Sequence, residues 1–185
     1  GRAWAISFAR AGYAVEMTDI DPDALNQSVQ TLKGSLADLA KHDLLNDQDV
    51  NTVAARVSPQ ESVAAALDGA TYVQENTAEV LEIKKQVYAE LDGMAAPETV
   101  IGSSTSGLKA SLFTEELKGR HRCLVAHPIN PPHLVPAVEL CPAPWTDEAA
   151  MDTTAAIMEN AGHKTIRMEK EIDGFIVNRM QIALL

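Results

Sequence analysis

Apolar residues recur along the chain with two spacings, which divide it into predicted strands and predicted helices. Short apolar runs are typical of strands, and longer segments whose apolar residues return about every three or four positions are typical of helices. The predicted strands span residues 13–19, 71–75, 98–103, 122–127, 135–140 and 164–168. The predicted helices span residues 1–11, 21–45, 58–70, 78–94, 147–162 and 174–185. This alternation predicts an α/β fold with a doubly wound, mostly parallel, Rossmann-like sheet.

Residues that favour helix ends support several of these boundaries. Gly12 is a natural C-cap for the opening helix, and Asp21 followed by Pro22 is typical of a helix start. Ser58 is expected to cap the short helix that follows it. No capping residue opens the first helix, and neither Gly nor Pro closes the last. We therefore expect a longer chain, with the first strand of the sheet upstream of residue 1.

Suggestive polar residues follow several of the predicted strands directly. They are Asp19, Glu75, the hydroxyl run 104–106, and His127. Parallel sheets of this class bind ligands beyond the carboxyl ends of their strands. The position of these residues therefore predicts a ligand site at that edge of the sheet.

Asp19, together with Gly1, fits part of the sequence pattern of a dinucleotide-binding site. Gly1 heads an apolar helix, and Asp19 ends the next strand at the distance where such sites carry the acid that binds ribose hydroxyls. The carboxylate would repel a 2′-phosphate, so NAD is favoured over NADP. A simple helix start and a strand-end N-cap would give the same two residues, and that alternative stays open.

Four residues form a candidate catalytic set: Ser106, His127, Glu139 and Asn178. A histidine base can accept the proton of an alcohol as hydride leaves its carbon, and a carboxylate can fix the tautomer of that base. Glu139 lies in an apolar run where an unpaired charge is costly, so we expect it to pair with His127. The serine hydroxyl and the asparagine amide would hold the substrate oxygen. Each residue alone also has an ordinary structural explanation in a turn, a strand edge or a helix.

Composition narrows the class of protein. The 185 residues carry a net charge of -11, which argues against nucleic-acid partners. No apolar run approaches the roughly 20 residues of a membrane span. Cys123 and Cys141 fall in or beside predicted strands and are expected to be small buried residues in a reducing cytoplasm. We predict no metal site.

Several motifs together resemble one known family, the NAD-dependent L-3-hydroxyacyl-CoA dehydrogenases. They are "AEVLEIKK" (78–85), "SSTSGL" (103–108), "AHPINPP" (126–132), "VEL" (138–140) and "GFIVNR" (174–179). Within the family, the chain resembles the lambda-crystallin branch, whose members oxidise L-gulonate at C3. L-carnitine dehydrogenases share a similar pattern and are the nearest alternative.

The resemblance implies roles for individual residues. His127 matches the family's catalytic base, Glu139 its partner, and Ser106 and Asn178 the residues that bind the reacting oxygen. Asn130 matches an asparagine that supports the substrate or its loop. The positions that match cofactor-binding residues are Gly1, Asp19, Glu79 and Lys84.

The family also implies two domains and a dimer. Residues 1–173 would form an N-terminally incomplete NAD-binding domain, and residues 174–185 the first helix of a helical domain that closes the cleft and forms the homodimer.

Four aspartates within 36–56, where CoA-dependent members carry basic residues, favour a small hydroxy acid substrate. L-3-hydroxyacyl-CoA, L-carnitine and a purely structural, crystallin-type role remain alternatives.

Overall fold

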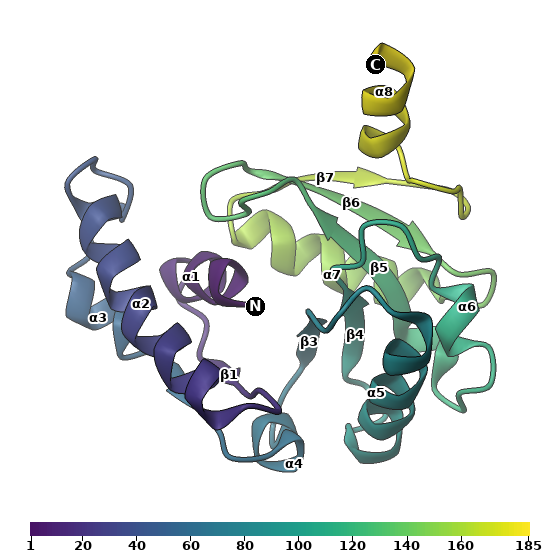
Figure 1. The fold of residues 1–185 in the computed structure, drawn as a ribbon, viewed down its shortest axis with the longest axis horizontal. Helices are drawn as coiled ribbons and strands as arrows, with labels where there is room; N and C mark the ends of the chain where they lie inside the picture. The colour runs from purple at the N-terminus through teal and green to yellow at the C-terminus, as the bar shows by residue number, and fades with distance from the viewer.

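The computed structural model describes residues 1–185 and arranges the chain in α/β layers (Figure 1). The strands are β1 (Val15–Met17), β2 (Val57–Pro59), β3 (Tyr72–Glu75), β4 (Val100–Ser103), β5 (Cys123–Pro128), β6 (Ala137–Pro142) and β7 (Lys164–Arg167). The α-helices are α1 (Arg2–Arg10), α2 (Pro22–Ala40), α3 (Val50–Ala54), α4 (Val63–Leu67), α5 (Leu81–Met94), α6 (Ser111–Thr114), α7 (Glu148–Asn160) and α8 (Val177–Leu184). A short 3-10 helix spans Arg120–Arg122.

The strands form two sheets. β1 and β2 pair in parallel, and the larger sheet has the order β3-β4-β5-β6-β7. Every neighbouring pair in the larger sheet is parallel except β5 and β6, which run antiparallel. The expectation of a mostly parallel, Rossmann-like sheet is confirmed. The β5–β6 reversal brings the start of β6 to the edge at which β5 ends.

Helices cover both faces of the larger sheet, and the alternation of side chains along β5 decides which residues each face receives. Leu124 and Ala126 pack with α1 and α7, whereas Cys123 and Val125 pack with α5 and α6 on the opposite face. Successive strand side chains point to opposite faces, so His127 belongs to the α5–α6 face. A third cluster joins α1 to α2, α3 and β2, and the three helices lie together in Figure 1.

Some local predictions are confirmed and one is wrong. Asp21 caps α2 by accepting from two backbone amides of the first turn, with Pro22 at its start. Gly12 follows the C-cap of α1 with φ +99°, a conformation that a side chain would strain. Ser58 does not cap a helix; it lies in β2, and Ser62 caps the helix that follows. The sequence had also given no indication of β2, α3 or α6.

The last helix stands apart from the layers. α8 extends from the sheet in Figure 1 and buries none of its residues. Met180, Ile182 and Leu184 are exposed on it. None of the helices combines the length and the apolar character that crossing a membrane requires.

Candidate active site

The site is built around a buried pair of side chains on β5 and β6. His127 and Glu139 are direct partners in the antiparallel register, which places both side chains on the same face. Nδ1 of His127 lies 2.7 Å from Oε2 of Glu139. His127 is 4% exposed and Glu139 is fully buried. The contact expected from the sequence is therefore present in the fold.

The other oxygen of Glu139 holds the start of α8. Glu139 Oε1 accepts hydrogen bonds from the backbone amides of Ile176 at 2.7 Å and Val177 at 3.0 Å. Phe175, which precedes them, is fully buried with φ +50°, and its ring centre lies 5.2 Å from that of His127. One carboxylate thus joins the histidine to the segment that enters α8. Phe175 belongs to the motif "GFIVNR", in which only the asparagine predicts a role in the site.

This geometry determines which nitrogen of His127 is available for chemistry. A carboxylate accepts from a ring N–H, so the contact assigns the proton of the neutral imidazole to Nδ1. Nε2 then carries a lone pair and has no hydrogen-bond partner in the chain. The pair can accept a proton at Nε2 while Glu139 stabilises the resulting imidazolium.

The structure brings Ser106 and Asn178 to the same place. The Asn178 amide donates from Nδ2 to the backbone oxygen of Ser106 at 2.6 Å. Asn178 follows directly after the two residues bound by Glu139, so the loop that carries Ser106 lies beside the buried pair. Ser106 is exposed, and its hydroxyl has no partner in the chain. Asn130 is exposed in the loop after β5 and makes no side-chain hydrogen bond.

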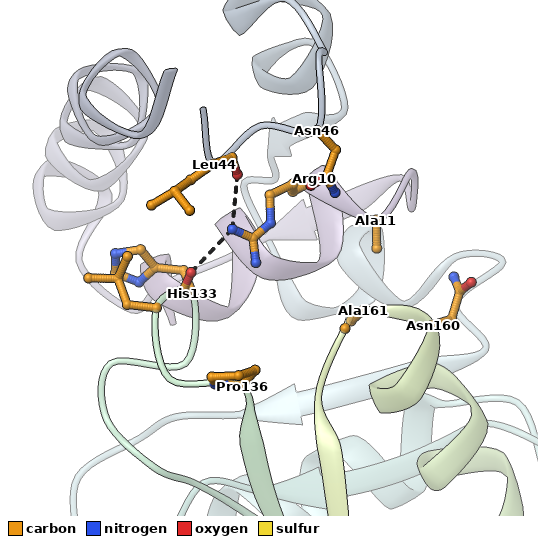
Figure 2. Close-up of a pocket in the computed structure, with 10 residues that line it drawn as sticks. Arg10, Ala11, Leu44, Asn46, His133, Pro136, Asn160 and Ala161 are labelled. Carbon is orange, nitrogen blue, oxygen red and sulfur yellow. Dashed lines mark hydrogen bonds between the residues drawn. The ribbon is translucent and has the colours of Figure 1, made fainter. Parts of the chain in front are cut away.

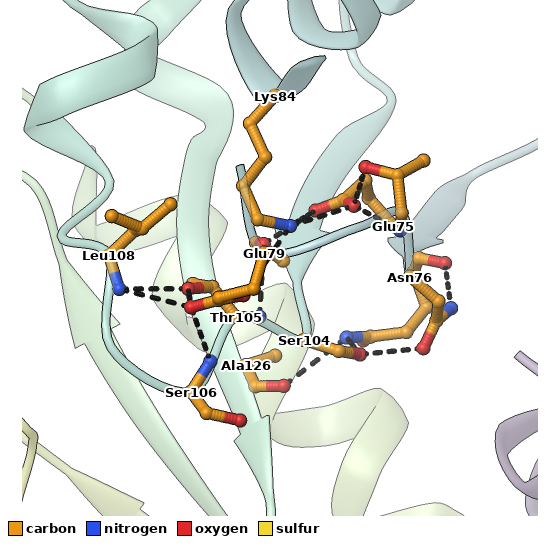
Figure 3. A network of polar contacts seen from close by, with 12 residues as sticks. Glu75, Asn76, Glu79, Lys84, Ser104, Thr105, Ser106, Leu108 and Ala126 are labelled. Atoms are coloured by element: carbon orange, nitrogen blue, oxygen red, sulfur yellow. Dashed lines mark hydrogen bonds and ion pairs between the residues drawn. The ribbon is translucent and has the colours of Figure 1, made fainter. Parts of the chain in front are cut away.

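A second polar network lies where β3 and β4 end (Figure 3). Glu75 accepts from Nζ of Lys84 at 3.0 Å to each oxygen, and the two side chains are each 1% exposed. Ser103 Oγ donates to Glu75 at 2.6 Å. Glu79, by contrast, is 46% exposed, with Oε2 4.0 Å from Nζ of Lys84. The structure therefore brings Glu79 and Lys84 together but places Lys84 inside the protein.

Glu79 has an unusual number of donors on one oxygen. Oε1 accepts from Thr105 Oγ1 at 2.5 Å, Ser106 N at 3.1 Å and Gly107 N at 2.9 Å. Burial acts to raise the pKa of Glu79, but these hydrogen bonds and the Lys84 charge together hold that pKa below its ordinary value. The carboxylate is thus ionised wherever the protein is folded near neutral pH.

Three side chains that the sequence did not single out, Trp4, Gln74 and Asn76, meet Ser104 at this edge. Ser104 Oγ accepts from Trp4 Nε1 at 3.0 Å and from Gln74 Nε2 at 2.7 Å, and donates to Asn76 Oδ1 at 2.8 Å. The start of α1 is thereby tied to the ends of β3 and β4. Tryptophan in an apolar helix looks like a core residue, so only the fold shows its N–H at the site.

A separate cavity of about 330 Å³ lies between α1, the α2–α3 connection and the β5–β6 loop (Figure 2). Arg10 and His133 line it, and Arg10 donates to the backbone oxygens of Leu44 and His133. Burial and the Arg10 charge lower the pKa of His133. None of the candidate catalytic residues lines this cavity.

Comparison with known proteins identifies the family of this chain. Residues 1–172 match the family described as 3-hydroxyacyl-CoA dehydrogenase, NAD binding domain. The chain belongs to this family. NAD is its cofactor. The lambda-crystallin homolog of Mus musculus is 36% identical over 186 residues, and the L-carnitine dehydrogenase of Streptomyces griseus is 35% identical over 184. Each covers 100% of this chain, which spans 58% and 54% of their lengths, respectively.

Solved structures show the same fold. The 3-hydroxybutyryl-CoA dehydrogenase of Escherichia coli matches with a TM-score of 0.90 and 25% identity over 96% of this chain and 37% of its own. A diketoreductase matches with a TM-score of 0.93, covering 99% of this chain and 65% of its own. At 23% identity, the second match supports the fold alone.

The exposed residues at this edge fit a dinucleotide. Asp19 is an exposed carboxylate just after β1 and has no cationic partner; its Oδ1 accepts from the Asp21 amide at 3.0 Å. Gly1 caps α1 and is exposed, with no atom near the position of a Cβ. Asp19 therefore keeps acceptor capacity for ribose hydroxyls, and the amides of the first turn of α1 are of the kind that bind phosphate groups.

Proposed function

We propose that this protein catalyses NAD-dependent oxidation of the C3 hydroxyl of a small L-3-hydroxy acid, with L-gulonate, giving 3-dehydro-L-gulonate, as the first candidate. The observation that carries the proposal is the buried His127–Glu139 pair, with Nε2 of His127 left free. A purely structural domain has no need for a carboxylate buried beside a histidine, since such a group is costly unless it is paired.

His127 acts as the base. Its Nε2 accepts the hydroxyl proton, while Glu139 keeps Nδ1 protonated and stabilises the imidazolium that forms. Bound NAD would supply the acceptor for the hydride of the carbinol carbon. Burial of Glu139 strengthens its effect, because water does not screen a fully buried carboxylate.

Ser106 and Asn178 hold the reacting oxygen. The Ser106 hydroxyl is free, and the Asn178 amide uses one of its two N–H groups on the Ser106 backbone, leaving the other for the substrate. Asn130, exposed in the adjoining loop, supports the substrate. These groups fix the oxygen near the base, and such positioning contributes strongly to rate.

Gly1, Asp19, Glu79 and Lys84 form the cofactor side of the site. Asp19 accepts from the ribose hydroxyls, and its charge disfavours a 2′-phosphate. Lys84 acts through the carboxylates of Glu75 and Glu79, because its own ammonium group is buried between them. Titration of the complete protein with both cofactors tests this assignment, and tighter binding of NADP than of NAD would overturn it.

The substrate class is argued from the region that includes α2 and α3. Asp38, Asp43, Asp47 and Asp49 are all exposed there, and the Lys41 ammonium is 2.8 Å from Asp38. On this surface the basic side chains are paired with carboxylates or outnumbered by them, which disfavours binding of the CoA phosphates. A free hydroxy acid is therefore favoured over an acyl-CoA, which is the second candidate, and L-carnitine is the third.

We also propose two parts to the chain and a dimer. Residues 1–173 form the NAD-binding part, and residues 174–185 begin a helical domain that closes the cleft and pairs with a second copy. The exposed apolar side chains of α8 support this division. We place the protein in the cytoplasm, consistent with two free, buried cysteines. Light scattering after size exclusion tests the dimer.

The decisive assay is NADH formation by the complete protein with L-gulonate, L-carnitine and L-3-hydroxybutyryl-CoA, measured side by side. A preference for L-gulonate supports the small-acid assignment, and a preference for the CoA ester overturns it while keeping the mechanism. His127→Gln should lower turnover by about 10²–10⁴ with NAD affinity nearly intact.

The alternative is a structural, crystallin-type role, favoured by the similarity to lambda-crystallins. It predicts that NAD raises the melting temperature while no substrate is turned over.

A further inference from the structure

We propose that Glu79 is a positioning residue for the reaction: it holds the loop of residues 104–108, here the Ser106 loop, so that the Ser106 hydroxyl faces the substrate. The proposal rests on the proposed function and adds a role to that site. It assigns to Glu79 a task toward the chain's own backbone, besides any contact with the cofactor.

The donors that meet Glu79 Oε1 come from consecutive residues. The Thr105 hydroxyl and the amides of Ser106 and Gly107 donate to it at 2.5–3.1 Å, with the Leu108 amide at 3.4 Å. Thr105 Oγ1 in turn accepts from the Leu108 amide at 2.9 Å. Amides that converge on one point form an anion site, and Glu79 occupies it permanently (Figure 3).

The position of Glu79 is itself set by the buried ion pair of Lys84 and Glu75. Lys84, at 4.0 Å from Oε2 of Glu79, is immobilised by its two contacts with the buried Glu75. Ser103 Oγ, at the end of β4, also donates to Glu75, so the Ser106 loop starts from the same network. The buried ion pair thus sets the place of the exposed carboxylate, which in turn sets the loop.

The Ser106 backbone is held from both sides. Its N–H donates to Glu79 and its carbonyl accepts from Asn178, which lies at the start of α8. With both neighbouring peptide groups fixed, the direction of the Cα–Cβ bond of Ser106 follows, and its hydroxyl is left with the few staggered positions about that bond. Glu79 therefore controls a substrate-binding hydroxyl without touching the substrate.

The charge is needed as well as the shape. Glutamine at this position would have one amide oxygen for the loop, and its NH₂ group would face the Lys84 ammonium in place of Oε2. Hydrogen bonds to a charged acceptor are about twice as strong as those between neutral groups. Glu79→Gln should therefore loosen the Ser106 loop without changing its bulk.

The first test reads the loop directly in the complete protein. Hydrogen exchange of residues 104–108 should speed up by about 10–100-fold in Glu79→Gln, which corresponds to the loss of charge-assisted bonds. Glu82→Gln, at an exposed carboxylate on α5, is the matched control and should leave exchange unchanged. Unchanged exchange in Glu79→Gln would overturn the proposal, whatever the enzyme turns out to oxidise.

The second test asks whether Glu79 acts through Ser106. If it does, Glu79→Gln should raise KM and lower kcat in the wild-type background but have little further effect in Ser106→Ala, a non-additive cycle. Full additivity, with the whole loss appearing in NAD affinity, would show that Glu79 serves only the cofactor. A wild-type protein without turnover on any substrate would instead refute the proposed function, and the exchange test would still decide the loop.

Discussion

Replacing Glu139 by glutamine tests the central pair, because the change keeps size and shape and removes only the charge. The carboxylate receives three donors: His127 Nδ1 at 2.7 Å and the amides of Ile176 and Val177 at 2.7 and 3.0 Å. A glutamine amide has one oxygen for these three donors. The backbone amides cannot turn away, whereas an imidazole can change tautomer, so we expect the oxygen to face α8 and the NH₂ group to face His127.

That orientation has a chemical consequence. Facing an N–H donor, Nδ1 of His127 must become the acceptor, and the proton of the neutral ring moves to Nε2. The base then has no lone pair toward the substrate. Turnover should fall by about 10²–10⁴, and NAD binding should be largely retained because Glu139 makes no hydrogen bond to a candidate cofactor-binding residue.

The stability cost follows from the same contacts. Hydrogen bonds to charged groups contribute about 1 kcal/mol more than neutral ones, so the three bonds give a loss of about 3 kcal/mol. For a domain of this size, that corresponds to a melting temperature lower by about 6–12 °C. Part of the loss comes from the start of α8, whose amides change from a charged to a neutral acceptor.

Circular dichroism melting and NADH formation at saturating substrate measure the two effects separately. Glu169→Gln, at an exposed carboxylate with no hydrogen bond or ion pair in the chain, is the control for loss of one negative charge. Normal turnover in Glu139→Gln would show that the pair does not set the tautomer of the base. Normal stability would show that α8 does not depend on the carboxylate.

Further predictions concern stability. Lys84→Met leaves a buried carboxylate unpaired and should cost about 3–5 kcal/mol, whereas the half-exposed Lys85→Met should cost little; urea unfolding measures both. Burial and the nearby Arg10 charge lower the pKa of His163, so the unfolded chain binds the extra proton first. The free energy of unfolding should therefore fall as pH drops below 6.5, and less steeply in His163→Asn. In Gly102→Ala the added methyl group meets the Tyr72 hydroxyl, so the free energy of unfolding should fall by about 1–3 kcal/mol. In Gly34→Ala, at an open helix position, the free energy of unfolding should rise by about 0.5–1 kcal/mol.

The spacing of apolar residues was sufficient to predict strands and helices that carry a full apolar pattern of their own. β5 and β6 are nearly continuous apolar runs, and such runs mark strands buried on both faces. Their pairing could be inferred because a carboxylate inside the second run requires a partner, and the titratable ring at the end of the first supplies one. The chemistry of a buried charge thus carried information about contact that the pattern alone did not.

The same approach failed where an element depends on its neighbours. β2 has only three residues and exists because β1 pairs with it in register, Val15 with Val57. Short strands have no measurable period, and its serine, Ser58, has the typical character of a helix cap. Ser62 takes the capping role because its backbone is extended just where α4 begins.

The Ser106 loop marks a different limit. The loop is held through its backbone N–H groups, which every residue except proline carries. The residue types therefore do not indicate which amides will donate to a carboxylate that is distant in the sequence. The resemblance to the family predicts that Glu79 belongs to the site. Its hydrogen-bond donors, however, depend on how β3, β4 and α5 pack together in the fold. The Ser106–Gly107 peptide group is bound by Glu79 through its N–H and by Asn178 through its C=O, so Glu79, Ser106 and Asn178 form a single unit. Their substitutions should therefore not add, and a role assigned to any one of them from a single variant will include the effects of the other two.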